Sequence, residues 1–295
     1  MNMRLIVLTF LGLLTMAVVV SSQNSPQNNI PKKSDSTDDV IVDIDFASRK
    51  PIVSLLYGST ALSREGIAGT VENATAFGGS LGMANERTWF RDKGIVQYRA
   101  HSLYGWVGIG ADAQSTVATT TSMDLFRIGL MDESGFGYKF SETSNITFLV
   151  ASAPLSWTSV TPLSVTADPT SAQSIRDFED GIRFGESMRP TIAWRIAEPV
   201  SLRVGYEWSQ IYPRHMFWYW MLSQTIEGIA DGAATWFARE IGKASPGAMP
   251  VVYFLLRNGV AAGFKALRMN QMNWPFTTVA PLNSQMWNVG VAIHF

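Results

Sequence analysis

Residues 287–295 read WNVGVAIHF and carry the cleanest alternating pattern in the sequence. Every second residue from Trp287 to Phe295 is large and apolar, and the residues between them are small or polar. Successive side chains of a β-strand point to opposite faces, so a period of two indicates a strand with one apolar side. The segment therefore predicts a long amphipathic strand.

The same period recurs upstream, most clearly in residues 184–210. Here two strands are predicted on either side of a turn at 197–199, with an aromatic-rich apolar face and a second face of small and charged residues. The apolar face consists of Ile192, Trp194, Ile196, Leu202, Val204, Tyr206 and Trp208. Further strands are predicted at 40–46, 76–84, 96–101, 126–131, 136–140 and 146–150, with a register slip near Gly105.

The predicted connections alternate in length. Short turns near 91–93, 141–145 and 197–199 alternate with longer connections near 60–72, 113–119, 162–181 and 213–282. Bacterial membrane barrels have short periplasmic turns, long extracellular loops and an even number of strands. The pattern therefore fits roughly eight antiparallel strands with both ends of the sheet on the periplasmic side.

The composition favours a membrane protein. Charged residues make up 16% of the chain, below the average of about 25% for soluble domains. Past the N-terminus, no stretch reaches the roughly 20 apolar residues of a helical span. Only helices and closed barrels satisfy their backbone hydrogen bonds in lipid, so the prediction is an all-β membrane barrel. The net charge of −1 gives no support for nucleic-acid binding.

With this final strand, the sequence resembles the outer-membrane β-barrel proteins of bacteria that have two membranes. In that class, the last strand carries alternating apolar residues and a terminal Phe that the barrel-assembly machinery recognises. The resemblance names a broad class and no functional family. It implies that this machinery is a partner during biogenesis and that outer-membrane lipid surrounds the barrel. The matching residues are Trp287, Val289, Val291, Ile293 and Phe295.

The N-terminal residues predict export. One positive charge precedes an almost unbroken apolar run at 6–20, and Val20, Ser21 and Ser22 offer small residues for cleavage before Gln23. The alternative is a retained anchor, for which the run is short. We expect a signal peptide at 1–22, a disordered periplasmic segment at 23–39, and a barrel at 40–295.

Residues 213–282 interrupt the strand pattern and predict a helical hairpin between the last two strands. The first helix is expected at 216–241, with an apolar stripe that includes Ile229 and Phe237; Pro250 opens the second helix. Gly259 and Gly263 have a spacing that permits close helix packing. The hairpin either packs on the barrel rim or contacts a protein partner or the outer leaflet. The candidate contact residues are Phe217, Trp218, Tyr219, Trp220, Trp236, Phe237 and Phe254.

The charged residues of the strands fall on their less apolar faces, which would line the lumen. An eight-stranded barrel is just filled by side chains, so these residues predict an internal salt-bridge network, with a polar pore as the alternative. The predicted lumen residues are Arg99, Arg127, Glu133, Lys139, Arg189, Arg195, Arg203 and Glu207.

No catalytic or metal-binding motif is present. There is no cysteine, and the three histidines, His101, His215 and His294, form no known metal-ligand spacing. We therefore expect no catalytic residue, no metal and no cofactor. The leading hypothesis is a non-enzymatic outer-membrane barrel with a structural or partner-binding role through its helical insertion. The alternatives are a small channel and an outer-membrane lipid-modifying enzyme.

Overall fold

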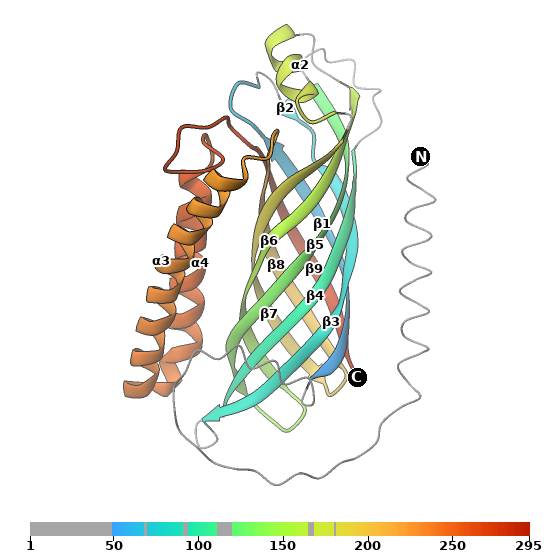
Figure 1. The fold of residues 1–295 in the computed structure, drawn as a ribbon. Helices are drawn as coiled ribbons and strands as arrows, with labels where there is room; N and C mark the ends of the chain where they lie inside the picture. Colours follow the sequence, from blue (N-terminus) through green and yellow to red (C-terminus); the bar gives the residue numbers. More distant parts are fainter. Residues whose placement is uncertain (1–48, 68–69, 91–93, 111–119, 165–167, 180) are drawn as a thin grey trace.

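The computed structural model describes residues 49–67, 70–90, 94–110, 120–164, 168–179 and 181–295. In this part of the chain, eight long strands form a barrel with two helices beside it (Figure 1). The long strands are β1 (Lys50–Ser63), β3 (Ala74–Phe90), β4 (Ile95–Ile109), β5 (Thr120–Lys139), β6 (Asn145–Ser164), β7 (Ile182–Ala197), β8 (Val200–Ile211) and β9 (Leu282–His294).

The sheet is closed. Its order is β5-β4-β3-β1-β9-β8-β7-β6, and β6 pairs back to β5. All of these pairings are antiparallel, whereas the two-residue β2 (Thr70–Val71) runs parallel to β5. Helices α3 (Phe217–Ala244) and α4 (Met249–Leu267) lie between β8 and β9, joined by the 3-10 turn η3 (Pro246–Ala248). The predicted eight-stranded barrel with a helical hairpin between its last two strands is confirmed.

Strand β9 shows how the wall is built. Trp287 and Val289 face outward and are 68% and 53% exposed, whereas Met286 and Ala292 are buried in the lumen. The backbone N–H of Phe295 donates to the carbonyl of Pro51 at 3.0 Å, so the pairing with β1 continues past the end of β9. The predicted alternation of the final strand is confirmed, while its recognition by the assembly machinery stays a prediction.

The two ends of the barrel differ. One end, here called the turn end, carries the β5–β6 and β7–β8 turns and Phe295; the other, the loop end, carries the longer connections (Figure 1). At the loop end, helix α2 (Pro169–Arg176) follows β6, and its Ile175, together with the nearby Phe178, is buried among lumen residues such as Trp106. This apolar cluster covers the loop end of the lumen.

The sequence patterns do not predict helix α2, because they assign residues 162–181 only to a connection between strands. The local signal was present in the sequence. The Asp168 carboxylate accepts a hydrogen bond from the Ser171 backbone N–H at 2.7 Å, and Pro169 opens the helix. An Asp-Pro pair at a helix start combines an N-cap with a residue preset for the first turn. The eight-residue helix is too short to produce a clear apolar period.

The prediction for β4 was wrong in two respects. Its pairing with β3 and β5 runs without a shift through Gly105. In the β3–β4 pairing the shift lies at Thr88/Phe90, and the β5–β6, β6–β7 and β7–β8 pairings have shifts of their own. Moreover, Tyr98 faces the lumen and Arg99 faces outward. The apparent slip arose because apolar side chains fill the lumen along β4, which reverses the expected polarity of its two faces.

The hairpin lies along the barrel wall rather than on its rim (Figure 1). Ala238, Met249 and Tyr253 pack with Phe136 and Val150 of the outer wall in one buried cluster. The Phe136 and Tyr253 rings meet edge to face, with centroids 4.9 Å apart. In the described part of the chain, no helix combines the length and the apolarity needed to cross a membrane.

Three predictions concern the N-terminal residues: the signal peptide at 1–22, the polar segment at 23–39 and the strand at 40–46. All three lie outside the described residues.

The packing of Gly78 against Trp106 gives a first testable prediction. A Cβ atom at Gly78 would lie 2.3 Å from the Cβ of Trp106 and from the carbonyl oxygen of Gly105, whereas one at Gly228 on α3 would meet nothing within 4 Å. We expect Gly78→Ala to lower the free energy of unfolding by about 1–3 kcal/mol through overpacking. Gly228→Ala should be neutral or slightly stabilising. Urea unfolding in detergent micelles measures both, and equal stability of the two variants would contradict the lumen packing.

Candidate functional site

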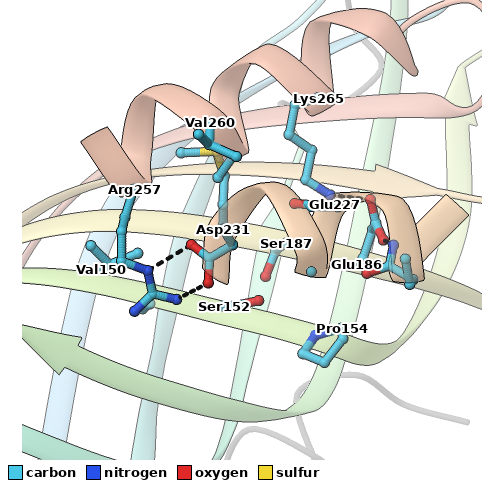
Figure 2. Close-up of a pocket in the computed structure, with 15 residues that line it drawn as sticks. Val150, Ser152, Pro154, Glu186, Ser187, Glu227, Asp231, Arg257, Val260 and Lys265 are labelled. Atoms are coloured by element: carbon cyan, nitrogen blue, oxygen red, sulfur yellow. Dashed lines mark hydrogen bonds and ion pairs between the residues drawn. The ribbon is translucent and has the colours of Figure 1, made fainter. Parts of the chain in front are cut away.

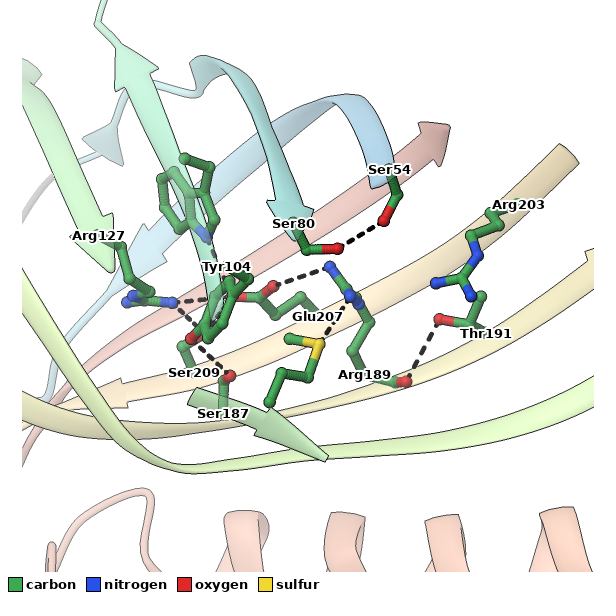
Figure 3. Close-up of polar contacts among 12 residues, drawn as sticks. Ser54, Ser80, Tyr104, Arg127, Ser187, Arg189, Thr191, Arg203, Glu207 and Ser209 are labelled. Carbon is green, nitrogen blue, oxygen red and sulfur yellow. Dashed lines mark hydrogen bonds and ion pairs between the residues drawn. The ribbon is translucent and has the colours of Figure 1, made fainter. Parts of the chain in front are cut away.

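The lumen contains a buried network of arginines and glutamates (Figure 3). The Arg127 guanidinium contacts the Glu207 carboxylate at 2.9 Å. The Glu133 carboxylate lies 3.0 Å from Arg203 and 3.3 Å from Arg189. Strands β5, β7 and β8 supply these groups, and each side chain is less than a tenth exposed. Paired charges are the form in which ionised groups tolerate burial.

Neutral side chains extend this network. The Nε of Arg127 donates to Thr158 at 2.9 Å, and its guanidinium lies over the Trp106 ring at 4.8 Å. Arg203 donates to the Tyr98 hydroxyl at 3.0 Å. Two small spaces border the network, of about 20 and 10 Å³. Side chains therefore fill the middle of the lumen, as expected for a barrel of eight strands.

The structure separates the predicted lumen residues into three groups. Arg127, Glu133, Arg189, Arg203 and Glu207 lie inside the barrel and contact one another. The others lie elsewhere.

Arg195 pairs with Glu86 at 2.9 Å near the turn end, and Lys139 pairs with Glu142 of the β5–β6 turn at 2.8 Å. Arg99 is exposed on the outer wall, so its assignment to the lumen is corrected. The reason is the reversed polarity of β4, whose lumen side carries Tyr98.

The three histidines lie far apart. His101 points outward and contacts the Asp132 carboxylate at 2.7 Å, while the neighbouring Ser102 is buried. His294 lies 3.0 Å from the Ser201 hydroxyl, but its other ring nitrogen faces the Arg195 guanidinium at 3.4 Å. A hydrolytic triad needs a carboxylate at that second nitrogen. Among the described residues, no group of three or more His, Cys, Asp or Glu is arranged to hold a metal ion.

A second charged cluster lies between the barrel wall and the hairpin (Figure 2). Glu186 points outward from β7, since it alternates with Ser187, which lines the lumen. Its carboxylate pairs with Lys265 of α4. It also pairs, at 2.9 Å, with Arg268, the residue that directly follows α4. Arg268 also pairs with Glu227 of α3. This cluster joins three elements and was not predicted from the sequence.

A crevice of about 230 Å³ adjoins this cluster, between the hairpin and strands β6 and β7 (Figure 2). Its other charged pair is Arg257 of α4 with Asp231 of α3, at 2.5 Å. Arg257 also donates to the Ser134 hydroxyl of β5 at 2.9 Å. Three carboxylates and three cations thus balance along the interface between hairpin and wall. The arrangement holds the hairpin against the barrel.

The sequence offered one signal for this cluster. Glu227 and Asp231 are four residues apart in an otherwise uncharged stretch, and so share one face of α3. Charges on one face of an apolar helix indicate partners on that face. Their partners could not be found, because Arg268 and Arg257 lie 41 and 26 positions further along the chain.

An aromatic cluster lies where the hairpin leaves β8. The Phe184 ring of β7 meets His215 and Trp220, with centroids 4.7 and 5.3 Å apart. Phe217 and Trp218 continue the cluster with centroids 5.2 Å apart, and they are 47% and 68% exposed. Of this cluster, the sequence singled out Phe217, Trp218 and Trp220.

The remaining candidate contact residues are distributed along the hairpin. The Tyr219 ring packs on the Phe276 ring, with centroids 5.1 Å apart, and the Phe254 ring packs on the Phe148 ring of the wall, with centroids 5.8 Å apart. Trp236 and Phe237 lie exposed on the far part of α3. The candidate contact residues thus do not form one patch. Only Phe217, Trp218 and Trp220 belong to the aromatic cluster.

No model of a known protein family and no curated protein matches the chain. Solved structures do show some likeness. Neisserial surface protein A is 11% identical and has a TM-score of 0.35, with coverage of 83% of this chain and 97% of that one. Ail, the attachment invasion locus protein of Yersinia pestis, is 7% identical and has a TM-score of 0.32, with coverage of 84% and 99%. A likeness this low carries no argument about function.

The lumen network predicts a large effect of one carboxylate. Glu207→Gln removes the charge beside Arg127, whose side chain is 1% exposed. Breaking a buried pair leaves an uncompensated charge, so we expect the free energy of unfolding to fall by about 3–5 kcal/mol. Glu142→Gln, at the exposed pair with Lys139, should leave it unchanged. Urea unfolding in micelles measures both, and an unaffected Glu207→Gln would contradict the network.

The hairpin cluster predicts a local effect. Glu186→Gln leaves Lys265 and Arg268 buried with less negative charge. We expect amide hydrogen exchange in α4 to accelerate, with the local opening free energy lowered by about 3 kcal/mol, while the strands stay protected. Glu240→Gln, at a more exposed pair with Lys243, is the control. Unchanged exchange in α4 of Glu186→Gln would show that other contacts hold the hairpin.

Proposed function

We propose that this protein is an outer-membrane β-barrel with a structural or partner-binding role, which its helical insertion serves. The distribution of polarity across the closed wall carries this proposal. Large apolar side chains such as Leu55, Trp194 and Val204 are exposed outside, while the charges of Arg127 and Glu133 are enclosed. Membrane barrels have an apolar outer band and a polar interior, whereas water-soluble barrels have the reverse.

A channel is the less favoured function. Conduction requires a continuous path for water, but the Arg127–Glu207 and Arg203–Glu133 pairs occupy the middle of the lumen. Ile175 and Phe178 cover its loop end. A lipid-modifying enzyme is also less favoured. Among the described residues, His294 lies beside Ser201 and Arg195, His101 beside Asp132, and His215 beside aromatic rings, so none of the three is placed between a serine and a carboxylate.

The aromatic cluster at the loop end is the surface that we propose for a protein partner. Trp218 and Phe217 are exposed there although they stand beside other aromatic rings. Trp and Tyr are enriched at protein interfaces, where a few such residues carry most of the binding energy. The cluster borders the extracellular side if the turn end faces the periplasm, as in other bacterial barrels.

Co-purification from native outer membranes tests this proposal. The full-length protein, cross-linked before solubilisation, should bring down a partner protein that mass spectrometry identifies in amounts close to its own. Trp218→Ala should reduce that partner at least tenfold, the loss expected when a hot-spot residue is truncated. Trp236→Ala is the matched control, because that tryptophan is 64% exposed at the other end of α3.

Two outcomes would count against the proposal. If the protein does not fractionate with the outer membrane, the membrane barrel is wrong. If no partner accompanies the wild type, or if Trp218→Ala retains it, the partner site at the loop end is wrong.

A further inference from the structure

The face of the hairpin that points away from the barrel is apolar along its length. From Phe217 to Phe237, the exposed residues of the fully described helix α3 carry no charge. On α4, Val251, Leu255 and Leu267 are exposed. Beyond the aromatic cluster at the start of α3, we call the exposed large apolar residues of the two helices the outer hairpin face. It consists of Leu222, Ile226, Ile229, Trp236, Phe237, Val251, Leu255 and Leu267.

The charges in the body of the hairpin lie on the opposite side. Asp231 and Arg257 pair with each other between the helices, and Lys265 pairs with Glu186 of the wall. Charges return to the surface only near the end of α3, where the Lys243 side chain is 63% exposed. The helices thus carry charged groups inside and large apolar groups outside, the reverse of a helix on a water-soluble protein.

Small and polar residues make the inner side of α3. Ser223, Ala238 and Gly242 are its buried residues, and a Cβ on Gly242 would lie 2.4 Å from the Met249 sulfur. The predicted apolar stripe of α3, which includes Ile229 and Phe237, is exposed instead. Helices in membranes pack through small residues and hydrogen bonds and keep large apolar side chains for the lipid.

The hairpin lies at the same level as the barrel wall. At the turn end, the Tyr138 hydroxyl donates to the carbonyl of Gly247 in the helical turn at 2.7 Å. Near the loop end, the Gln210 amide of β8 donates to the carbonyl of Lys265 at 3.1 Å. The 28 residues of α3 span about 42 Å, which is comparable with the wall itself. Whatever surrounds the wall therefore also surrounds the hairpin.

The wall beneath the hairpin is unsuited to lipid by itself. Glu186 would expose a carboxylate, and Ser134 a hydroxyl, to hydrocarbon. An unpaired charge at membrane depth is costly, and the hairpin covers Glu186 with Lys265 and Arg268. The hairpin therefore covers the polar groups of this part of the wall and presents an apolar surface in their place.

We infer that the outer hairpin face contacts the acyl chains of the membrane lipids, so that the hairpin and the barrel lie in the hydrocarbon layer as one body. Neither helix is apolar enough to cross the layer by itself; the hairpin enters it only with its charged groups paired between the helices and against the wall. This inference rests on the proposed function, because it requires the barrel to be in a membrane. The occupant is hydrocarbon because the face is uncharged, lies level with the apolar wall and continues the exposed apolar surface of the strands.

Spin labels test this inference in the full-length protein, which has no native cysteine. Ile229→Cys and Leu255→Cys place labels on the outer hairpin face. Val289→Cys is the reference on the bare barrel wall, and Lys243→Cys is the reference for water. Each variant is reconstituted in phosphatidylcholine vesicles, and collisions of the label with oxygen and with a water-soluble nickel chelate are measured.

We expect oxygen collisions to exceed nickel collisions at Ile229 and Leu255, as at Val289, and the order to reverse at Lys243. If Val289 meets oxygen but both hairpin positions meet nickel, the inference is overturned while the membrane barrel stands. If both reagents are excluded from the hairpin positions, protein covers the face, and the inference is also overturned. If Val289 itself meets nickel, the proposed function fails first.

Discussion

The hydrogen bonds between β1, the first long strand, and β9, the last, close the sheet, and the rest of the structure depends on this closure. An open sheet leaves two edges whose backbone groups need partners, and no such partner exists in lipid. Once the edges are joined, every strand has an inside and an outside. Two separate environments follow from one pairing, and each accepts different side chains.

The two charged clusters illustrate these environments. Inside the lumen, Arg127 and Glu207 are enclosed by the wall on all sides, so the network fills space and fixes the strands around it. On the outside, Glu186 has no such enclosure, and the hairpin supplies both its counter-charges and its cover. Both carboxylate oxygens of Glu186 have hydrogen-bond partners, and a satisfied buried network favours a single arrangement. In the lumen, Nε of Arg203 and Oε2 of Glu207 have no hydrogen-bond partner among the described residues. The same chemistry therefore holds the barrel together in one place and attaches a helical layer in the other.

Local patterns predicted the parts of the fold that depend on local sequence. The alternation of β9 and of the β7–β8 pair, the turn after Ala197 and the helical hairpin were all evident, because period and turn residues are encoded within a few residues. The faces of β4 were not, since Tyr98 turns inward to meet Arg203, which is 105 positions away. The position of the hairpin depends on the contact between Tyr253 and Phe136, and the charged interface depends on the contact between Glu186 and Lys265. No local period in the sequence encodes either contact.

The hairpin connects β8 to β9 but packs on β5, β6 and β7, on the other side of β8. This displacement leaves the seam between β1 and β9 uncovered. If β9 is the last strand to join the barrel, its pairing edge must stay accessible until it meets either a template strand or β1. The helical hairpin does not cover the edges of β1 and β9, so it does not obstruct their pairing. A large insertion just before the last strand is therefore compatible with ordinary barrel assembly.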